Sequence, residues 1–382
     1  MKKIGIYVHI PFCVRKCNYC DFYSVKWNNE LENKYIDSVV KEIISYKESL
    51  SSDYMVDTVY FGGGTPSIVK PESFLKIMKS INKVFKIEES AEISMEANPN
   101  TLNKINLPAY RELGINRISI GVQSLKDDIL NKLGRLHDSR EAIAALKEAE
   151  YYGFENINAD VMFNIPGQTF KDIEETILKL VKENVSHISF YSLKIEKGTP
   201  FYLMEKNHEL IMPEDDFERE MYYTGRNIME KNNLKQYEIS NFSKIGYECR
   251  HNLKYWRQEE YIGIGPSAHS FLHNKRYSNP GNIDSYIINA ENGLFKRDVQ
   301  EIMDYDDLEF EYIMLNLRLT DGLNINSFNK KFSLDFNRKY EKEVDFLIKN
   351  KLLEREDNDE IRLTKRGMDI SNYVFQYFMN NR

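Results

Sequence analysis

The first half of the chain alternates between two patterns of apolar and polar positions. Short runs that are almost wholly apolar are followed by longer segments in which apolar residues recur every three or four positions. The first pattern predicts strands covered on both faces, and the second predicts amphipathic helices. The predicted strands are Ile4–Ile10, Thr58–Phe61, Ala91–Ala97, Arg117–Val122, Asn156–Phe163 and His187–Leu193.

The segments between these runs can serve as crossover helices between parallel strands. Two clear examples are the sets Leu31, Tyr35, Val39 and Ile43, and Phe170, Ile173, Ile177 and Leu180. Six βα units in succession, with no Gly-x-Gly-x-x-Gly turn after the first strand, favour a barrel over a dinucleotide-binding fold. We therefore predict an α/β fold with a partial (β/α)6 barrel.

The alternation of strands and helices weakens after about residue 205. The stretch Tyr237–Ser270 is rich in glycine and aromatic residues and has little regular period. We expect the segment at about 205–295 to close the mouth of the barrel.

Helical periodicity returns from about Asp304. It is followed by two short strand-like runs, Leu352–Glu356 and Ile361–Thr364, around an Asp/Asn turn, and then by a final helical segment. We predict a barrel domain over residues 1–295 and a small helical, winged-helix-like C-terminal domain over residues 296–382.

Composition narrows the class of protein. A chain of 382 residues that is 42% apolar is long enough for two domains with real cores. The net charge is -7, and the 52 Lys and Arg residues are interspersed with 59 Asp and Glu residues, so nucleic acid is not an expected partner. No stretch is long and apolar enough for a membrane span, and the N-terminal apolar run, interrupted by His9, has no cleavage site. We expect a cytoplasmic protein.

Three of the four cysteines lie within eight positions. Cys13, Cys17 and Cys20 have the spacing Cys-x3-Cys-x2-Cys, while Cys249 stands apart. Such a cluster favours metal ligation in a reducing compartment over disulfides, and it fits a zinc site poorly because no companion pair exists. On a loop after a strand, three thiolates can hold three irons of a 4Fe-4S cluster and leave the fourth iron open for a chelating ligand.

The residues around these cysteines carry a family resemblance. Tyr7-Val-His-Ile-Pro-Phe-Cys13, the triplet itself and Cys20-Asp-Phe-Tyr-Ser24 resemble the coproporphyrinogen-oxidase-like branch of the radical S-adenosylmethionine (SAM) superfamily, and the resemblance covers nearly the whole chain. It implies that the amino and carboxylate groups of SAM chelate the fourth iron. It also implies reductive cleavage of SAM to a deoxyadenosyl radical, with an electron donor such as flavodoxin or ferredoxin.

Glycines and polar residues follow several predicted strands and should meet at one edge of the sheet. Successive glycines in Gly62-Gly63-Gly64-Thr65-Pro66 let a ligand approach the backbone, so we expect Gly64→Val to weaken SAM binding and to leave the iron content intact. On the residues alone, the glycines could form a tight turn, the tyrosines could be core residues and Arg135 could be solvated. The resemblance implies SAM contacts at Tyr7, Tyr19, Gly63, Gly64, Thr65, Glu96, Gln123, Arg135 and Asp160.

The segment His251-Asn-Leu-Lys-Tyr-Trp256 contains a second candidate site. An exposed His251 could ligate haem iron through a ring nitrogen while Tyr255 and Trp256 pack on the macrocycle. On the residues alone, ordinary packing of a lid loop is the better explanation of the segment. The pattern His-Asn-x-x-Tyr-Trp resembles the signature of HemW-type haem chaperones, which implies that His251 binds haem, with Cys249 as a further haem partner or a plain apolar filler.

Three functions are compatible with these features. The oxygen-independent coproporphyrinogen III oxidases carry a further cysteine where this chain has Phe22, and an extension before the strand that here begins at Ile4. The resemblance therefore favours a haem chaperone that passes haem to an unknown acceptor protein. The alternatives are the oxidase or another radical SAM enzyme that modifies porphyrin or haem, and a binding module with a vestigial cluster. No catalytic residue is assigned.

Overall fold

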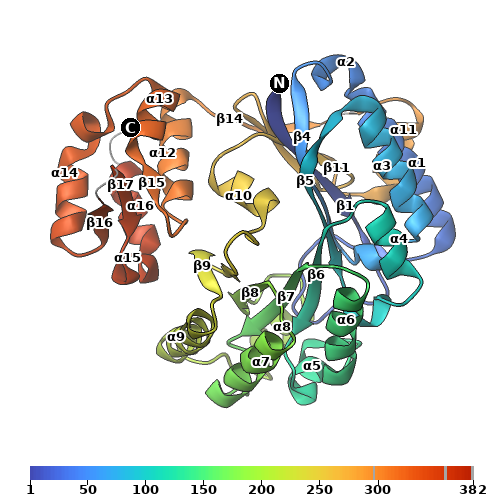
Figure 1. Ribbon diagram of the computed structural model, residues 1–382, viewed down its shortest axis with the longest axis horizontal. Coiled ribbons are helices and arrows are strands. Elements are labelled where there is room, and N and C mark those ends of the chain that lie inside the picture. Colours follow the sequence, from blue (N-terminus) through green and yellow to red (C-terminus); the bar gives the residue numbers. More distant parts are fainter. Residues whose placement is uncertain (296, 357–358, 380–382) are drawn as a thin grey trace.

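The computed structural model describes residues 1–295, 297–356 and 359–379. A curved twelve-stranded sheet forms the larger part of the molecule (Figure 1). Its strands, in spatial order, are β14 (Asp298–Ile302), β13 (Lys275–Ser278), β12 (His269–Leu272), β11 (Tyr261–Ile264), β1 (Lys2–Ile10), β4 (Tyr54–Gly63), β5 (Lys86–Ala97), β6 (Arg117–Gln123), β7 (Asn156–Phe163), β8 (His187–Ser192), β10 (Asn241–Ser243) and β9 (Lys235–Glu238).

The centre of the sheet is parallel. All six predicted strands are present as β1 and β4 to β8, and they pair in parallel order. Strand β11 adds a seventh parallel strand on the other side of β1, with Tyr7 opposite Gly263. Within the described residues, β9 and β14 are the two edges and do not pair with each other. The prediction of an α/β fold with a partial barrel is therefore confirmed.

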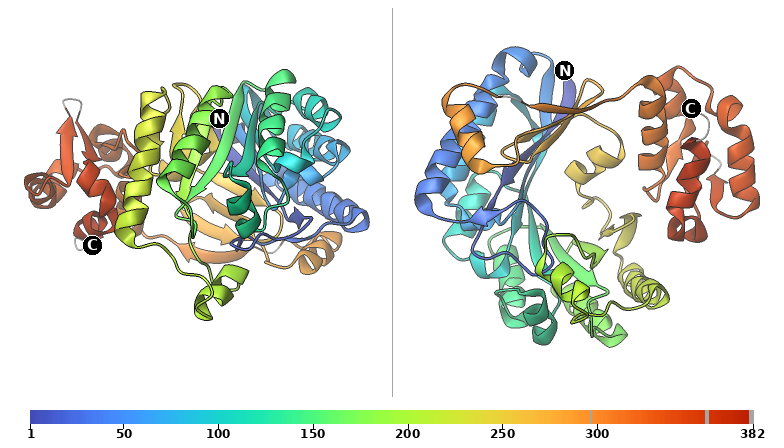
Figure 2. Two further views of the ribbon diagram at one scale, coloured as in Figure 1. Left: turned by 90° about the horizontal axis from the view of Figure 1, so that it is seen from below. Right: turned by 180° about the vertical axis from the view of Figure 1, so that it is seen from behind.

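Helices cover the outer face of the parallel strands (Figures 1 and 2). Helices α1 and α7 contain the two apolar sets whose spacing predicted them, and both sets face the sheet. The helices of this part are α1 (Asn29–Ser45), α2 (Lys47–Leu50), α3 (Pro71–Val84), α4 (Asn106–Glu112), α5 (Asp127–Leu133), α6 (Ser139–Tyr151), α7 (Phe170–Lys182), α8 (Pro200–Lys206), α9 (Asp215–Lys231), α10 (Arg250–Trp256) and α11 (Ile283–Glu291).

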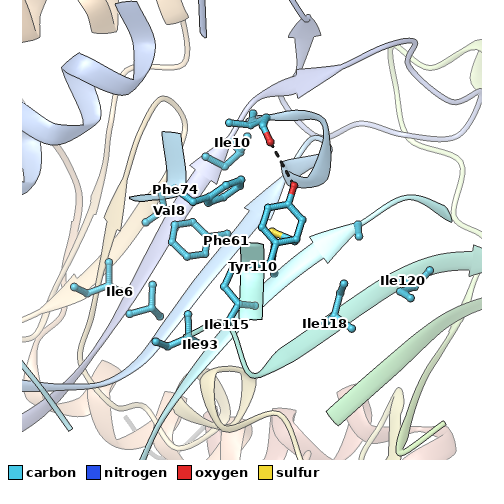
Figure 3. Packing of buried hydrophobic residues seen from close by; sticks show 14 of the residues in the cluster. Ile6, Val8, Ile10, Phe61, Phe74, Ile93, Tyr110, Ile115, Ile118 and Ile120 are labelled. Carbon is cyan, nitrogen blue, oxygen red and sulfur yellow. Dashed lines mark hydrogen bonds between the residues drawn. The ribbon is translucent and has the colours of Figure 1, made fainter. Parts of the chain in front are cut away.

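The core lies between the sheet and these outer helices (Figure 3). Ile6, Val8 and Ile10 of β1 are fully buried, and Phe61 of β4 meets Phe74 of α3 edge to face with ring centroids 5.0 Å apart. Each such side chain contributes about 1.5–3 kcal/mol when it is fully removed from water. Because successive strand residues point to opposite faces, the residues between these apolar positions line the concave inner face.

A second domain packs around its own core at the C-terminal end. Phe328, Phe336 and Tyr340 are buried there among helices that cover a small antiparallel sheet in the order β15-β17-β16. The predicted helical C-terminal domain is confirmed, while residues 357–358 of the expected turn lie outside the described part. The elements are α12 (Tyr305–Asn316), β15 (Leu323–Asn324), α13 (Ile325–Phe332), α14 (Phe336–Lys349), β16 (Leu353–Glu356), β17 (Glu360–Leu363), α15 (Lys365–Asp369) and α16 (Ser371–Met379).

The C-terminal domain stands on the open side of the curved sheet, and α10 lies between the two (Figures 1 and 2). The predicted domain boundary between residues 295 and 296 stays a prediction. Strand β14 follows that position and pairs with β13, so the large sheet continues to Ile302. The closing segment also contains regular structure, namely α9 to α11 and strands β9 to β13.

Candidate functional site

A cavity of about 940 Å³ opens at the carboxyl ends of the parallel strands. Most of the residues predicted to bind the cluster or SAM line this cavity. Tyr7 does not: it lines an adjoining inner chamber of about 280 Å³, together with His251, the residue predicted to bind haem. The predicted residues that line the large cavity are Cys13, Cys17, Cys20, Tyr19, Gly63, Gly64, Thr65, Glu96, Gln123, Arg135 and Asp160.

The cysteine loop is fixed at both ends. Strand β2 (Phe12–Cys13) pairs in parallel with β3 (Val25–Lys26), and so closes the loop between them. In its middle, Asn18 donates hydrogen bonds to the carbonyl oxygens of Leu133 (3.0 Å) and Lys132 (2.9 Å). These carbonyls lie at the end of α5, where the helix has unsatisfied acceptors. Asn18 therefore provides hydrogen-bond donors for carbonyl groups at the end of α5, and these bonds hold the cysteine loop against the helix.

The three thiols suit an iron–sulfur cluster better than a single metal ion. Across the described residues, no three His, Cys, Asp or Glu side chains are grouped as ligands of one metal ion. In a cubane cluster each cysteine binds a different iron, so the sulfurs do not converge on one point. Burial raises the pKa of the Cys13 thiol, and it raises that of Cys20 to about 11. The thiols of Cys13 and Cys20 therefore hold their protons more tightly than free thiols, and a bound metal would have to displace these protons.

The glycine segment brings the end of β4 against the strand that leads into the cysteine loop. The amide of Gly64 donates to the Ile10 carbonyl (2.8 Å), and the amide of Thr65 donates to the Phe12 carbonyl (2.7 Å). A Cβ atom on Gly64 would lie 2.7 Å from the Phe12 oxygen. The glycine is therefore required by contact with the chain itself, and the expectation that Gly64→Val would spare the iron site lacks structural support.

Glu96 lies at the end of β5 with both carboxylate oxygens occupied. Oε1 accepts a hydrogen bond from the Tyr60 hydroxyl (2.9 Å), and Oε2 accepts one from the amide of Gly63 (3.0 Å). Gly63 has a φ of 113°, which positions its amide for this bond. Burial, together with the nearby Asp160 carboxylate, raises the pKa of Glu96 to about 7. The carboxyl group is thus poised to gain or lose a proton near neutral pH.

Arg135 follows α5 and points back into the cavity, because Gly134 ends the helix in the left-handed conformation. Its Nη1 lies 3.5 Å from the Cys17 sulfur. Its Nη2 donates to Oδ1 of Asn98 (2.6 Å) and to the Gly121 carbonyl (2.7 Å). Arg135 is therefore not a solvated helical side chain.

Gln123 and Asp160 complete this wall of the cavity. Gln123 ends β6 with a φ of 64°, and its Oε1 accepts a hydrogen bond from the Tyr191 hydroxyl at 2.8 Å. Asp160 accepts from Asn158 at 2.7 Å. The sequence placed Asn98 with Glu96 at the end of a predicted strand, facing the same mouth, but gave it no ligand role. It did not assign Tyr60 or Tyr191 to the site.

His251 is buried rather than exposed, which corrects the expectation from the sequence. Only 1% of its surface is accessible. Its Nδ1 is 2.8 Å from the Thr58 hydroxyl, and its Nε2 is 2.9 Å from the Tyr255 hydroxyl. Burial, assisted by the positive charges of Lys254 and Arg117, lowers the pKa of His251 to about 3. The ring is therefore neutral, and both of its nitrogens have hydrogen-bond partners.

The residues around His251 are also packed. Tyr255 meets Tyr261 edge to face at 4.6 Å, and the guanidinium of Arg318 lies 5.5 Å from the Trp256 ring centroid. The Cys249 sulfur is buried, 3.6 Å from a carboxylate oxygen of Glu92. These contacts hold α10 between the sheet and the C-terminal domain.

Similarity to known proteins agrees with this geometry. The radical SAM superfamily profile matches residues 7–180, and the HemN C-terminal domain profile matches residues 303–370. The solved structure of the coproporphyrinogen III oxidase HemN from Escherichia coli superposes with a TM-score of 0.84 at 19% identity, over 99% of this chain and 90% of that one. At this identity the match shows a shared fold. No helix in the described ranges is long and apolar enough to cross a membrane.

Two curated relatives match along their whole length. The protein named heme chaperone HemW from Bacillus subtilis is 35% identical over 375 residues, which cover 98% of both chains. Its namesake from Lactococcus lactis is 33% identical and covers 99% of this chain and 98% of the relative. Given similarity of this extent along both chains, the protein belongs to the HemW family of radical SAM proteins.

Proposed function

We propose that the protein is a haem chaperone that binds haem and transfers it to an acceptor protein. The observation that carries this proposal is the full-length similarity to relatives named heme chaperones. The match to the oxidase HemN supports the oxidase alternative less, because it concerns the fold alone.

The large cavity offers a suitable volume for such a cargo. Small-molecule sites occupy about 300–1,000 Å³ and are mostly lined by apolar and aromatic groups. The cavity measures about 940 Å³, and Phe163, Phe190 and Tyr222 are among its lining residues. Phe163 and Phe190 stack with ring centroids 4.4 Å apart. Flat aromatic walls of this kind suit the face of a macrocycle.

The cluster and SAM sites belong to the same proposal. Cys13, Cys17 and Cys20 would hold a 4Fe-4S cluster, which when bound and reduced supplies the electron for SAM cleavage. Glu96 can accept hydrogen bonds from ribose hydroxyls when it is ionised. The other proposed SAM contacts in the cavity are Tyr19, Gly63, Gly64, Thr65, Gln123, Arg135 and Asp160.

Two predicted residues, Tyr7 and His251, can contact their ligands only if further requirements are met. Tyr7 lies in the inner chamber, with its hydroxyl 3.0 Å from Nδ1 of His9, so a direct contact with SAM requires a ligand that reaches this depth. His251 can ligate haem iron only after its hydrogen bond to Thr58 or Tyr255 breaks. We therefore propose that α10 moves when haem binds to His251.

The partners follow from the same chemistry. We propose a flavodoxin or ferredoxin as electron donor, since Arg15 and Lys16 of the cysteine loop are exposed and would face an acidic protein. The haem acceptor is a separate protein. A cytoplasmic location agrees with three cysteines kept reduced for iron.

Haem titration of the reconstituted protein tests the function. A chaperone should bind haem stoichiometrically, with a Soret shift, and then pass it to an added apo-haemoprotein. It should not decarboxylate coproporphyrinogen III in the presence of SAM and reductant. Decarboxylation with matching deoxyadenosine release would establish the oxidase instead, and failure to bind or transfer haem would reject the chaperone role.

A further inference from the structure

The inner chamber lies on the concave face of the sheet, deeper than the large cavity. The two spaces share Glu96, Asp160 and Ser189 as lining residues, so they adjoin at these side chains. Beyond these three shared residues, the chamber is lined by Arg117 of β6 and by residues of α10, among others. Arg117 lies two residues before Ser119, which pairs with Glu96, and is thus about 7 Å deeper along the strands.

Arg117 is a buried cation without partners for much of its guanidinium. Only 2% of its surface is accessible, and neither Nε nor Nη1 has a hydrogen-bond partner among the residues that the structure describes. Arginine does not lose its charge in proteins. Its charge lies near the carboxyl groups of Glu92, Glu96 and Asp160. Buried N–H donors without an acceptor are nevertheless unfavourable, so an acceptor from outside the chain is expected to satisfy them.

The carboxylates near the chamber are already engaged by other donors. Glu92 accepts from the amides of Arg250 (2.9 Å) and His251 (3.1 Å) at the start of α10. Glu96 accepts from Tyr60 and Gly63, as described above. Asp160 accepts from Asn158 and Ser119. The guanidinium therefore retains donors that none of these groups uses.

We propose that the inner chamber binds a carboxylate group, which Arg117 holds through its planar fork. Arginine binds carboxylates with two parallel hydrogen bonds from adjacent N–H groups. An anion on either edge of the Arg117 guanidinium would use one of the two unused donors, Nε or Nη1, beside Nη2. Either anion would face the neighbouring acids Glu92, Glu96 and Asp160, and a singly charged carboxylate is repelled less by them than a doubly charged phosphate. This comparison favours a monoanion.

The aromatic residues of the chamber indicate what the carboxylate is attached to. Tyr60 stacks on Tyr7 with ring centroids 6.2 Å apart and on His251 at 5.3 Å, and Tyr255 closes the row. These rings line the chamber together with Arg117. A short aliphatic or aromatic acid fits a space of about 280 Å³, which is too small for a whole macrocycle.

Two sources can supply this carboxylate. One is a free small acid. The other is a propionate side chain of a porphyrin that occupies the large cavity and reaches down past Glu96 and Asp160; this second source rests on the proposed haem function. Sodium propionate, haem and haem dimethyl ester distinguish them, since the ester keeps the macrocycle but lacks the charge.

The experiment uses the full-length reconstituted protein and calorimetric titration at constant ionic strength. Wild type should bind one propionate per chain, with chloride as the blank, and Arg117→Gln should weaken binding at least about tenfold. Arg111→Gln is the matched control, since Arg111 of α4 lies outside both spaces, with its guanidinium 5.2 Å from the Phe154 ring centroid. Equal propionate affinity in wild type and Arg117→Gln would overturn the proposal.

A structural measurement keeps the proposal testable if Arg117→Gln does not fold. A crystal of the wild-type protein grown in propionate should show a planar anion on Arg117, and water alone at that position would overturn the proposal. Haem binding that weakens on both esterification and Arg117→Gln would identify the porphyrin arm as the ligand, while binding of propionate alone would identify a free acid. If propionate binds but haem does not, the carboxylate site stands and the chaperone function fails.

Discussion

The sulfur of Cys17 accepts a hydrogen bond from Nη1 of Arg135 over 3.5 Å. The same guanidinium also binds Asn98 and the Gly121 carbonyl, so one side chain connects the cysteine loop to the ends of β5 and β6. A hydrogen bond to a thiolate is stronger than one to a thiol because the acceptor is charged. This contact should therefore strengthen when iron is bound.

Replacing Arg135 with Gln should loosen the cysteine loop and the SAM pocket together. We expect iron to be lost faster to a chelator and SAM affinity to fall about tenfold or more, because several charge-assisted hydrogen bonds disappear. Iron-release kinetics and SAM titration measure these effects. Arg140→Gln is the control, since Arg140 pairs with Asp138 at the surface and its side chain is 89% exposed. Unchanged values in Arg135→Gln would mean that the contact has no role in the cluster site.

Replacing Gly64 with Ala should reduce the iron content as well as SAM binding. The added Cβ would press on the backbone of Ile10 and Phe12, immediately before Cys13. Iron and sulfide analysis after reconstitution checks this expectation. Gly281→Ala is the control, because its Cβ would meet the Ser267 hydroxyl at an ordinary 3.4 Å. A full cluster with weakened SAM binding in Gly64→Ala would support the ligand-approach explanation drawn from sequence.

SAM affinity should rise with pH because Glu96 accepts ribose hydrogen bonds best when ionised. With a pKa of about 7, the ionised fraction increases roughly tenfold between pH 6 and pH 8. Glu96→Gln should bind SAM weakly and with a flat profile over this range. Titrations at pH 6, 7 and 8 provide the measurement, and a wild-type affinity independent of pH would contradict the role.

The carboxyl group of Glu96 should also make the stability of the fold depend on pH. Stability should fall as the pH rises, whereas SAM affinity should increase. A raised pKa in the folded state means that the group stabilises the fold below pH 4.5, its ordinary pKa, and that this contribution is lost as the pH rises through 7. In the absence of SAM, Glu96→Gln should therefore gain stability relative to wild type on going from pH 5 to pH 8. Thermal unfolding at the two pH values tests the sign.

Removing the Tyr255 hydroxyl should free Nε2 of His251. If His251 ligates haem, Tyr255→Phe should bind haem faster than wild type, because one hydrogen bond no longer has to break. His251→Ala should shift the Soret band or abolish tight binding. His137→Ala is the control, since His137 is also buried and its Nε2 is 3.2 Å from the Val122 carbonyl. Tight binding that survives His251→Ala with an unshifted Soret band would reject His251 as the ligand.

The cysteines should divide into two classes in a metal analysis. Wild type should hold about four irons and four sulfides per chain, and SAM should change the EPR spectrum of the reduced cluster. Cys17→Ala should lose the SAM-responsive cluster. Cys249→Ala should retain it, because Cys249 lies in the inner chamber beside Glu92. A full, SAM-responsive cluster in Cys17→Ala would refute the assignment.

The sequence predicted the parallel sheet well because each central strand is a distinct apolar run. Strand β11 was missed because Tyr261–Ile264 is short, contains Gly263 and pairs with β1, which lies far from it in the sequence. Local sequence does not reveal such a distant pairing. Likewise, the cysteine spacing identified the cluster loop, whereas the hydrogen bond between Arg135 and Cys17 depends on how α5 ends.

The burial of His251 could not be predicted from its own segment. Its space is provided by Gly5 of β1: a Cβ atom there would lie 2.9 Å from the Lys254 side chain and 3.2 Å from the His251 ring. A glycine in a predicted strand carries no sign of which distant side chain it accommodates. The burial of Arg117 was equally hard to predict. The first residue of a predicted strand is usually exposed to solvent, but Arg117 is buried.

The position of β11 beside β1 has a consequence for biosynthesis. Strand β1 leads into the cysteine loop, yet one of its edges is covered only when Tyr261–Ile264 pairs with it. On the ribosome, the N-terminal βα units emerge long before that partner, so the backbone groups along this edge stay open to other strands during translation. Iron inserted at this stage would enter a loop that follows a strand, β1, still lacking one of its two partners. A pause or truncation before residue 261 would leave the nascent chain prone to aggregation. Cluster loading is therefore better suited to the completed chain than to the nascent one.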